Sequence, residues 1–276
     1  MLKGLYKISR PMTTLTGAIA VLLGGYVAGT HQWVKVALAV ISTVLVSAAA
    51  NAWNDYRDIE IDKVNQPERP LPAGLVTPQA AWIFSLIMAG GALLLAALIN
   101  WPAFLVALAA NVLLYIYSWK LKSTVLLGNM TIASISALSA VYGGIAAGNV
   151  RPSLWLAAVI VVGILGREVL KTLADYEGDL RQQCKTIATV WGRRAARIVF
   201  YLLVAATLVV MMTPYLANVY RPVYAYIVAI GVYPVIIYVM VRVNRERTGR
   251  QLEKLSQLMK YDFIVWFLAV LLGAAA

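Results

Sequence analysis

Residues Gln79–Ile99 read QAAWIFSLIMAGGALLLAALI, a continuous apolar run without a charged side chain. About 20 such residues in a helix cross the roughly 30 Å hydrocarbon layer of a bilayer. The apolar residues do not alternate at period two, which argues against a strand of a membrane β-barrel. We therefore predict that this stretch is a transmembrane helix.

Eight further stretches have the same apolar character. Of the 276 residues, 61% are hydrophobic and 13% are charged, whereas soluble domains have about 45–50% apolar and about 25% charged residues. A soluble core of this size does not hide so much apolar surface. We predict an all-α integral membrane protein, a single membrane-embedded domain over residues 1–276, with nine transmembrane helices: Met12–Gly29, Trp33–Trp53, Gln79–Ile99, Ala103–Ser118, Val125–Ala147, Leu154–Ala174, Ala195–Thr213, Tyr220–Val241 and Tyr261–Ala275.

The net charge of +12 is spread over the loops. If successive spans alternate in direction, nearly all of the 24 Lys and Arg residues fall on the side of the N-terminus, and only Lys35, Arg151 and Arg221 fall on the other. Such a bias places the basic loops in the cytoplasm. We therefore predict a multi-pass protein of the cell membrane with a cytoplasmic N-terminus and the C-terminus outside. A nucleic-acid partner is not expected, because the positive charge recurs from loop to loop and forms no single face.

Acidic residues gather in two windows at the cytoplasmic ends of predicted spans. If the helix continues through each window, carboxylates four residues apart share one face and repel each other. Near lipid, desolvation makes their ionised forms still less favourable. Two such clusters at one membrane face indicate a cation between them. Eight of the 12 Asp and Glu residues belong to these windows: Asp55, Asp58, Glu60 and Asp62 in the first, and Glu168, Asp175, Glu177 and Asp179 in the second.

A metal at these windows must use oxygen ligands, because the chain has one cysteine, Cys184, and one histidine, His31. Such a donor set suits Mg²⁺ or Ca²⁺. Mg²⁺ takes one or two carboxylates and completes its shell with water and substrate phosphate. Carboxylates and bases at the mouth of an apolar bundle therefore predict a pocket for a phosphorylated lipid. The bases nearest the windows, which complement a diphosphate, are Lys63, Arg69, Lys122, Lys171 and Lys185.

Three segments carry recognisable motifs. They read Asn54-Asp-x-x-Asp58-x-x-x-Asp62 followed by Asn65-x-Pro67-x-Arg69-Pro70-Leu71-Pro72-x-Gly74, then Tyr117-Ser118-x-x-Leu121-Lys122, and then Asp175-Tyr176-Glu177-Gly178-Asp179. Together they resemble the signatures of the UbiA superfamily of intramembrane prenyltransferases, and the similarity covers essentially the whole chain. The resemblance implies nine helices around a central cavity open to cytoplasm and lipid, with Mg²⁺ ions held by the two Asp-rich motifs and bridging the diphosphate of a prenyl donor.

The resemblance also assigns site residues by position. The implied metal ligands are Asn54, Asp58 and Asp62 from the first motif and Asp175 and Asp179 from the second. Arg69 and Lys122 match bases that hold the diphosphate, and Asp58, Asp175 and Lys122 are the residues expected to be essential for catalysis. Three further bases are assigned to substrate binding by nearness to the motifs alone: Lys63, Lys171 and Lys185.

Two more residues are candidates for substrate binding on physical grounds. Tyr117 would shield and stabilise an allylic cation with its aromatic face, although a tyrosine at a span end also serves as an interfacial anchor. Arg10, beside Pro11, would hold a phosphate or carboxylate of the acceptor, although a basic residue there also snorkels to the membrane surface. Both interpretations of each residue stay open.

Within the superfamily, residues 54–74, 117–129 and 166–179 resemble most closely the branch that makes archaeal-type ether lipids. This implies transfer of a geranylgeranyl group to geranylgeranylglyceryl phosphate. Thr172 and Ala174 stand where that branch carries acids, so the alternative is prenylation of an aromatic acceptor, such as hydroxybenzoate or naphthoate, in quinone biosynthesis. An ion-coupled transporter is a more distant alternative, because its acids normally lie near the bilayer midplane rather than at span ends. No obligate protein partner is expected.

Overall fold

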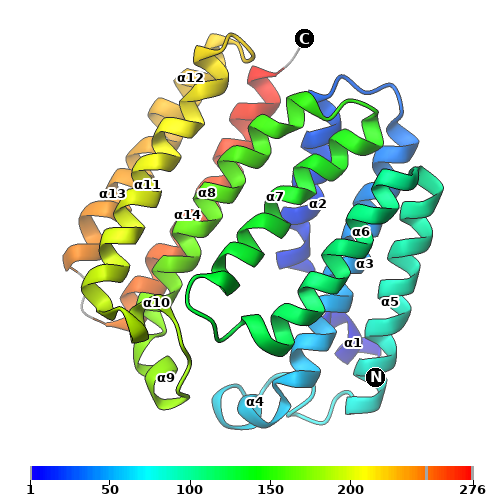
Figure 1. Ribbon diagram of the computed structural model, residues 1–276, viewed down its shortest axis with the longest axis vertical. Coiled ribbons are helices and arrows are strands. Elements are labelled where there is room, and N and C mark those ends of the chain that lie inside the picture. Colours follow the sequence, from blue (N-terminus) through cyan, green and yellow to red (C-terminus); the bar gives the residue numbers. More distant parts are fainter. Residues whose placement is uncertain (1, 246–247, 275–276) are drawn as a thin grey trace. The chain divides into compact units, whose positions relative to one another are not determined.

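A computed structural model describes residues 2–245 and 248–274, and every regular element in them is a helix (Figure 1). This confirms the predicted all-α fold. Eight helices in the described residues are long and apolar enough to cross a membrane, so the chain is a multi-pass membrane protein. They are α3 (Trp33–Arg57), α5 (Pro78–Ile99), α6 (Trp101–Ile116) continued by the π-helix η1 (Tyr117–Leu121), α7 (Leu127–Ala147), α8 (Arg151–Ala174), α11 (Gly192–Leu216), the helix formed by α12 (Pro222–Ile227), η2 (Val228–Val232) and α13 (Tyr233–Arg245), and α14 (Gly249–Gly273).

The first predicted span, Met12–Gly29, corresponds to α2 (Pro11–Val27), which has 17 residues and is shorter than the other eight. Pro11 opens this helix at a position where a missing backbone N–H is harmless. The nine apolar stretches therefore correspond to nine helices, of which eight have full membrane-spanning length. The remaining helices in the described residues are short: α1 (Leu2–Ile8), α4 (Ile59–Asn65), α9 (Tyr176–Arg181) and α10 (Ile187–Val190).

The predicted start of the last span, at Tyr261, is wrong. Helix α14 begins about three turns earlier, at Gly249. Thr248 caps it: the Thr248 hydroxyl accepts from the backbone N–H of Gln251 at 3.3 Å, and the Gln251 side chain accepts from the backbone N–H of Thr248 at 3.1 Å. This reciprocal pair is a capping box. The first turns of α14 are too polar to stand out by hydropathy, because they contain Arg250, Glu253 and Lys254.

The chain divides into two compact units. The first contains Met1–Leu121 and Leu138–Ser153, and the second contains Lys122–Ala137 and Leu154–Ala276. Helix α7 contributes to both units. The expectations of a single domain and of a central cavity stay predictions.

In the first unit, α3 packs against α2, α5 and α6. Helix α2 also meets the C-terminal part of α7 at very short range. A Cβ added to Gly24 would lie 2.0 Å from the carbonyl oxygen of Ala140, and one added to Gly143 would lie 2.0 Å from that of Val21. Only glycine permits two membrane helices to approach this closely.

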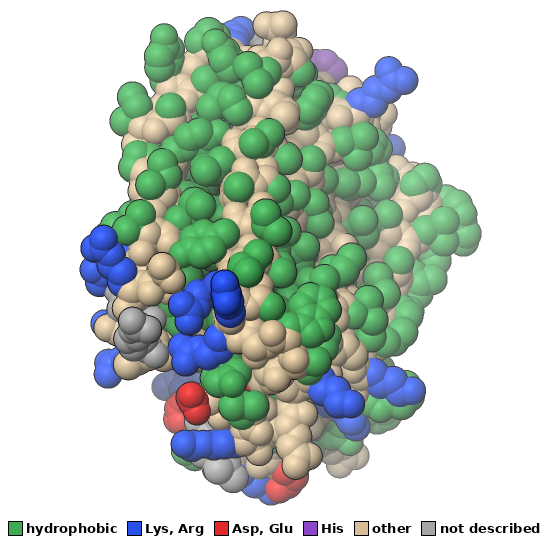
Figure 2. Space-filling view, turned by 60° about the vertical axis from the view of Figure 1, so that its left-hand side comes forward, with side chains coloured by type: hydrophobic (Ala, Val, Ile, Leu, Met, Phe, Trp, Pro, Cys, Tyr) green, Lys and Arg blue, Asp and Glu red, His purple; other side chains and the backbone are tan. Residues whose placement is uncertain are grey.

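In the second unit, α14 packs against α12, η2 and α13. A Cβ on Gly249 would lie 2.2 Å from the carbonyl oxygen of Ala174, so the start of α14 lies against the end of α8. Arg197 at the start of α11 donates to Asn244 at the end of α13 at 3.3 Å. Figure 2, which brings the α11–α13 side forward, shows hydrophobic side chains along most of this face and Lys and Arg gathered toward one end.

Candidate functional site

The first Asp-rich motif lies where a long helix gives way to a short one. Helix α3 ends at Arg57, α4 begins at Ile59, and Asp58 between them has φ −92° and ψ 5°. The helix therefore does not run unbroken through the acidic window. The backbone hydrogen bonds nevertheless keep helical spacing, with Asp58 N–H donating to Asn54 at 2.9 Å and Asp62 N–H donating to Asp58 at 2.8 Å. The Asn54 side-chain amide donates to Asp58 Oδ2 at 3.0 Å, so these two predicted ligands do lie together.

The second motif has the same local design. Helix α8 ends at Ala174, α9 begins at Tyr176, and the intervening Asp175 has φ −86° and ψ 1°. Here too the ladder continues, with Asp175 N–H donating to Lys171 at 2.8 Å and Asp179 N–H donating to Asp175 at 2.8 Å. Each motif thus places one aspartate at a helix junction and a second at the fourth residue of the short helix that follows.

Two arginines neutralise the first motif. Asp62 and Asp55 are buried. Arg69, from the loop after α4, donates from Nη1 to Asp62 Oδ2 at 2.7 Å and lies 3.8 Å from Asp55 Oδ1. Arg10 pairs with the same Asp55 oxygen. In the sequence Asp55 stands out only as part of the acidic window, because its partner Arg10 lies 45 residues away and no local pattern shows the pairing.

The predicted bases differ in what they contact. Lys171 Nζ pairs with buried Glu168 at 3.0 Å, and Lys63 Nζ pairs with exposed Glu60 at 2.7 Å. Lys122 and Lys185 are exposed. Tyr117, half-buried, is the first residue of η1. The structure therefore brings Arg69 to the first motif, but it directs Lys63 toward Glu60.

The second motif is short of positive charge. Burial, together with the neighbouring negative charge of Asp175, raises the pKa of Asp179 to about 6. A hydrogen bond with Thr186 and the positive charges of Lys122 and Lys171 lower the pKa of Asp179. The charges of the two lysines have this effect because both bases lie near the second motif. Two carboxylates that resist ionising side by side are stabilised by a bound cation.

The donor set of each motif fits a hard divalent cation. Within residues 2–245 and 248–274, no three His, Cys, Asp or Glu side chains come together as a metal site. Mg²⁺ needs only one or two carboxylates when water and phosphate supply its other ligands. Asn54 with Asp58, and Asp175 with Asp179, provide such small oxygen sets. Asp62 Oδ2 accepts from Arg69, so this oxygen can bind the metal only by exchanging the Arg69 guanidinium for it.

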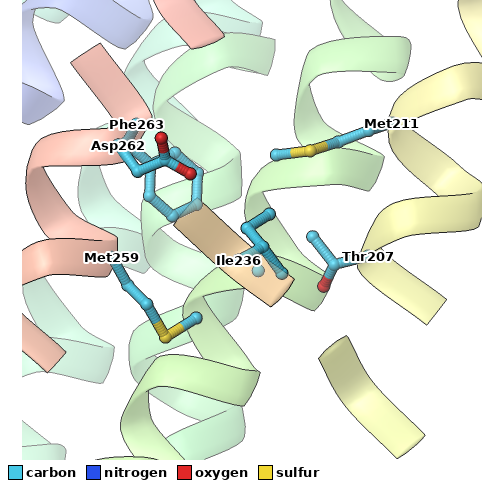
Figure 3. A pocket seen from close by; sticks show the side chains of 7 residues that line it. Thr207, Met211, Ile236, Met259, Asp262 and Phe263 are labelled. Carbon is cyan, nitrogen blue, oxygen red and sulfur yellow. The ribbon is translucent and has the colours of Figure 1, made fainter. Parts of the chain in front are cut away.

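A separate cavity lies inside the second unit, between α8, α11, α13 and α14 (Figure 3). Its volume of about 10 Å³ is roughly that needed by one water molecule, so a prenyl chain does not fit. Asp262 of α14 lines it, is 6% exposed, and has no hydrogen-bond partner for Oδ1 among the described residues. Asp262 is not among the residues predicted from the sequence, although a lone carboxylate in a predicted span is a signal of a special role.

Comparison with known proteins places these features in a family. Residues 12–275 match the sequence model of the UbiA prenyltransferase family. The chain is 34% identical over 238 residues to a digeranylgeranylglyceryl phosphate synthase of Thermococcus sibiricus, covering 86% of this chain and 82% of the relative. A solved structure from a study of digeranylgeranylglyceryl phosphate synthase in membranes matches with a TM-score of 0.83 and 28% identity, covering 99% of this chain and 98% of the other. A UbiA homologue from Archaeoglobus fulgidus, solved with GPP and Mg²⁺, shares the fold at 18% identity and a TM-score of 0.74, covering 95% of this chain and 99% of the other.

Proposed function

The chain belongs to the UbiA prenyltransferase family, and from that premise we propose that it transfers a geranylgeranyl group from its diphosphate to geranylgeranylglyceryl phosphate. The product is a lipid with a second ether-linked isoprenoid chain. The similarity to digeranylgeranylglyceryl phosphate synthases over most of the chain supports this choice of donor and acceptor. Prenylation of an aromatic acceptor is the alternative, because the side chain at position 172 is a buried neutral threonine where the ether-lipid branch has an acid.

The observation that carries the proposal is the shared design of the two motifs. Asp58 and Asp175 both occupy the junction between a membrane-spanning helix and a short helix, with backbone angles within a few degrees of each other. A reaction that expels a diphosphate needs cations at the leaving group. Each motif carries two aspartates at the end of a span and is suited to binding such a cation.

We assign the metal to Mg²⁺, held by Asn54, Asp58 and Asp62 from the first motif and by Asp175 and Asp179 from the second. When bound, Mg²⁺ stabilises the negative charge that develops on the departing diphosphate. Oxygen ligands of this kind suit Mg²⁺ better than softer transition metals.

Basic side chains hold the remaining phosphate charge. Lys122 and Lys171 lie near Asp179, so these two bind the diphosphate oxygens. Arg69 lies at the first motif and binds a phosphate group of the substrates there. Lys63 and Lys185 assist only if their side chains turn toward the substrate, because Lys63 pairs with Glu60 in this structure.

The organic part of the reaction needs shielding from water. The bond between C1 of the prenyl group and the diphosphate oxygen breaks, and the diphosphate leaves with the bonding electrons. The acceptor hydroxyl oxygen then bonds to C1, and its proton passes to the diphosphate that has left. Tyr117 shields the allylic cation with its ring, and Arg10 binds a phosphate group of one of the two substrates.

The active site faces the cytoplasm in this proposal. Positively charged residues accumulate on the cytoplasmic side of membrane proteins. In the second unit, the end of α8 that carries Asp175 lies against the start of α14, and Arg250 and Lys254 follow within its first turns.

An acceptor panel tests the proposal. Membranes containing the protein receive geranylgeranyl diphosphate, Mg²⁺ and either geranylgeranylglyceryl phosphate, hydroxybenzoate or dihydroxynaphthoate, and products are identified by mass spectrometry. We expect product with geranylgeranylglyceryl phosphate. Product with an aromatic acceptor alone would establish the alternative, and solute flux without any product would indicate a transporter.

Variants of the motifs complete the test. Asp58→Asn and Asp175→Asn should each lower turnover by about 100-fold or more, the scale expected when a group that stabilises developing charge is lost. Glu177→Gln is the matched control, because it removes an exposed acid from the same short helix as Asp179. Unchanged turnover in both Asp variants would refute the assigned site.

A further inference from the structure

The proposed function assigns no role to Asp55 of the first motif. Its side chain is 3% exposed, and a single atom, Oδ1, contacts Arg10 and lies 3.8 Å from Arg69 Nη1. The guanidinium groups come from distant parts of the first unit, since Arg10 precedes α2 and Arg69 follows α4. One buried carboxylate thus gathers two positive charges.

The backbone at Arg10 is unusual and supports a functional role. Arg10 has φ 49° and ψ 61°, a left-handed conformation that non-glycine residues adopt infrequently. Such conformations persist where the surrounding structure imposes them, often at ligand sites. Here the conformation stands at the N-cap of α2, on the residue whose side chain reaches Asp55.

Stability alone gives little reason to bury these charges. Replacing a buried ion pair by apolar residues is often neutral or stabilising, so its presence is weak evidence for a stabilising role. The arginines are also not sealed off: the side chains of Arg10 and Arg69 are 33% and 23% exposed. Each guanidinium has five N–H donors in a planar fork, and one carboxylate oxygen engages only a fraction of them.

We propose that Asp55 is a positioning residue that holds Arg10 and Arg69 together as a two-guanidinium site for one phosphate group. The inference rests on the proposed function, which supplies two phosphate-bearing substrates. The phosphate is either the diphosphate of the prenyl donor or the phosphate of the acceptor. Paired guanidinium groups suit both, because each can form two parallel hydrogen bonds to a phosphate.

The carboxylate has two effects on this site. It offsets the repulsion between the two arginines, and it fixes the direction from which Arg10 approaches, while Arg69 is also held by Asp62 at 2.7 Å. Asn at position 55 keeps the shape but removes the charge, so Arg10 is no longer held beside Arg69, which stays paired with Asp62. Glu keeps the charge but moves it outward by one methylene, so the pair survives with altered geometry. The two substitutions therefore grade the effect: Asp55→Asn loses more than Asp55→Glu.

Steady-state kinetics of the full-length protein in detergent or nanodiscs test the inference, with donor and acceptor varied separately. Asp55→Asn should raise KM for one of the two substrates by roughly tenfold, the effect of about one lost charge-assisted contact, with kcat changed less than about threefold. Asp55→Glu should show an intermediate KM. A donor effect identifies the diphosphate as the ligand, and an acceptor effect identifies the acceptor phosphate.

Glu68→Gln is the matched control, because it removes an exposed acid directly beside Arg69 in sequence and should leave both KM values unchanged. Unchanged KM for both substrates in Asp55→Asn would overturn the inference. If Asp55→Asn does not yield folded protein, Asp55→Glu carries the test alone, and unchanged KM for both substrates in that variant overturns it. Failure of the proposed function is seen separately, as a wild-type protein without product from geranylgeranylglyceryl phosphate. In that case the KM measurement for the acceptor is replaced by inhibition with inorganic pyrophosphate and with inorganic phosphate, measured with the acceptor that is used. Equal inhibition of the wild type and the variant would overturn the inference.

Discussion

Arg69→Met tests whether an arginine stands in for the metal at the first motif. In this structure Arg69 donates to Asp62 at 2.7 Å, and the Asp62 side chain is 6% exposed. Breaking a buried ion pair by removing one partner costs about 3–5 kcal/mol. The Arg69 side chain is 23% exposed, so solvent screens the pair and we expect a loss of about 2–3 kcal/mol in the free energy of unfolding without metal.

Mg²⁺ should recover most of this loss. A ligand present at 100 times its Kd stabilises the folded state by about 2.7 kcal/mol, and in the variant Asp62 is available to the metal without displacing an arginine. The assay is unfolding in detergent micelles, with EDTA and with Mg²⁺, for wild type and variant. Arg57→Met is the control, because Arg57 is exposed at the end of α3. An equal deficit with EDTA and with Mg²⁺ would refute the idea that Arg69 and the metal share Asp62.

Three further predictions concern packing, burial and pH. Gly143→Ala should lower the free energy of unfolding by about 1–3 kcal/mol, because its Cβ would lie 2.0 Å from the carbonyl oxygen of Val21. Gly90→Ala is the control and should not lower it, because nothing lies within 4 Å of a Cβ there. Equal unfolding midpoints for the two variants would contradict the close α2–α7 approach. Asp262→Asn should raise the unfolding midpoint at pH 8, because an unpartnered buried carboxylate costs about 1–3 kcal/mol; a lower midpoint would reveal a partner for it. The pKa of Asp179 is raised to about 6, so protons compete with the metal for this carboxylate in acid. The Mg²⁺ concentration that gives half-maximal activity should therefore increase when the pH is lowered from 7.5 to 5.5. A pH-independent value would exclude Asp179 as a ligand.

The helices could be predicted from sequence because lipid leaves few alternatives. A backbone that crosses a bilayer must satisfy its own hydrogen bonds, so a long apolar run such as Gln79–Ile99 becomes a helix regardless of its neighbours. The grouping of Asn54 with Asp58 could also be predicted, because residues four apart share a face in any helical ladder. The start of α14 could not, since a polar first turn capped by Thr248 carries no hydropathy signal.

The ion pairs of the first motif could not be predicted from the sequence for a different reason. The pair between Arg10 and Asp55 joins residues 45 apart and depends on a left-handed backbone at Arg10. The contact between Arg69 and Asp62 depends on how the loop after α4 folds back. Tertiary packing decides both, and no local propensity encodes them.

The central claim is that the two Asp-rich motifs bind the same diphosphate through shared metal ions. A structure of the protein with Mn²⁺ and a non-reactive thio analogue of geranylgeranyl diphosphate, with Mn²⁺ located by anomalous scattering, tests it most directly. We predict metal ions about 2.0–2.2 Å from carboxylate oxygens of both Asp58 and Asp175, each also bound to an oxygen of one analogue molecule. Metal bound at one motif while the other stays remote from the diphosphate would contradict the account.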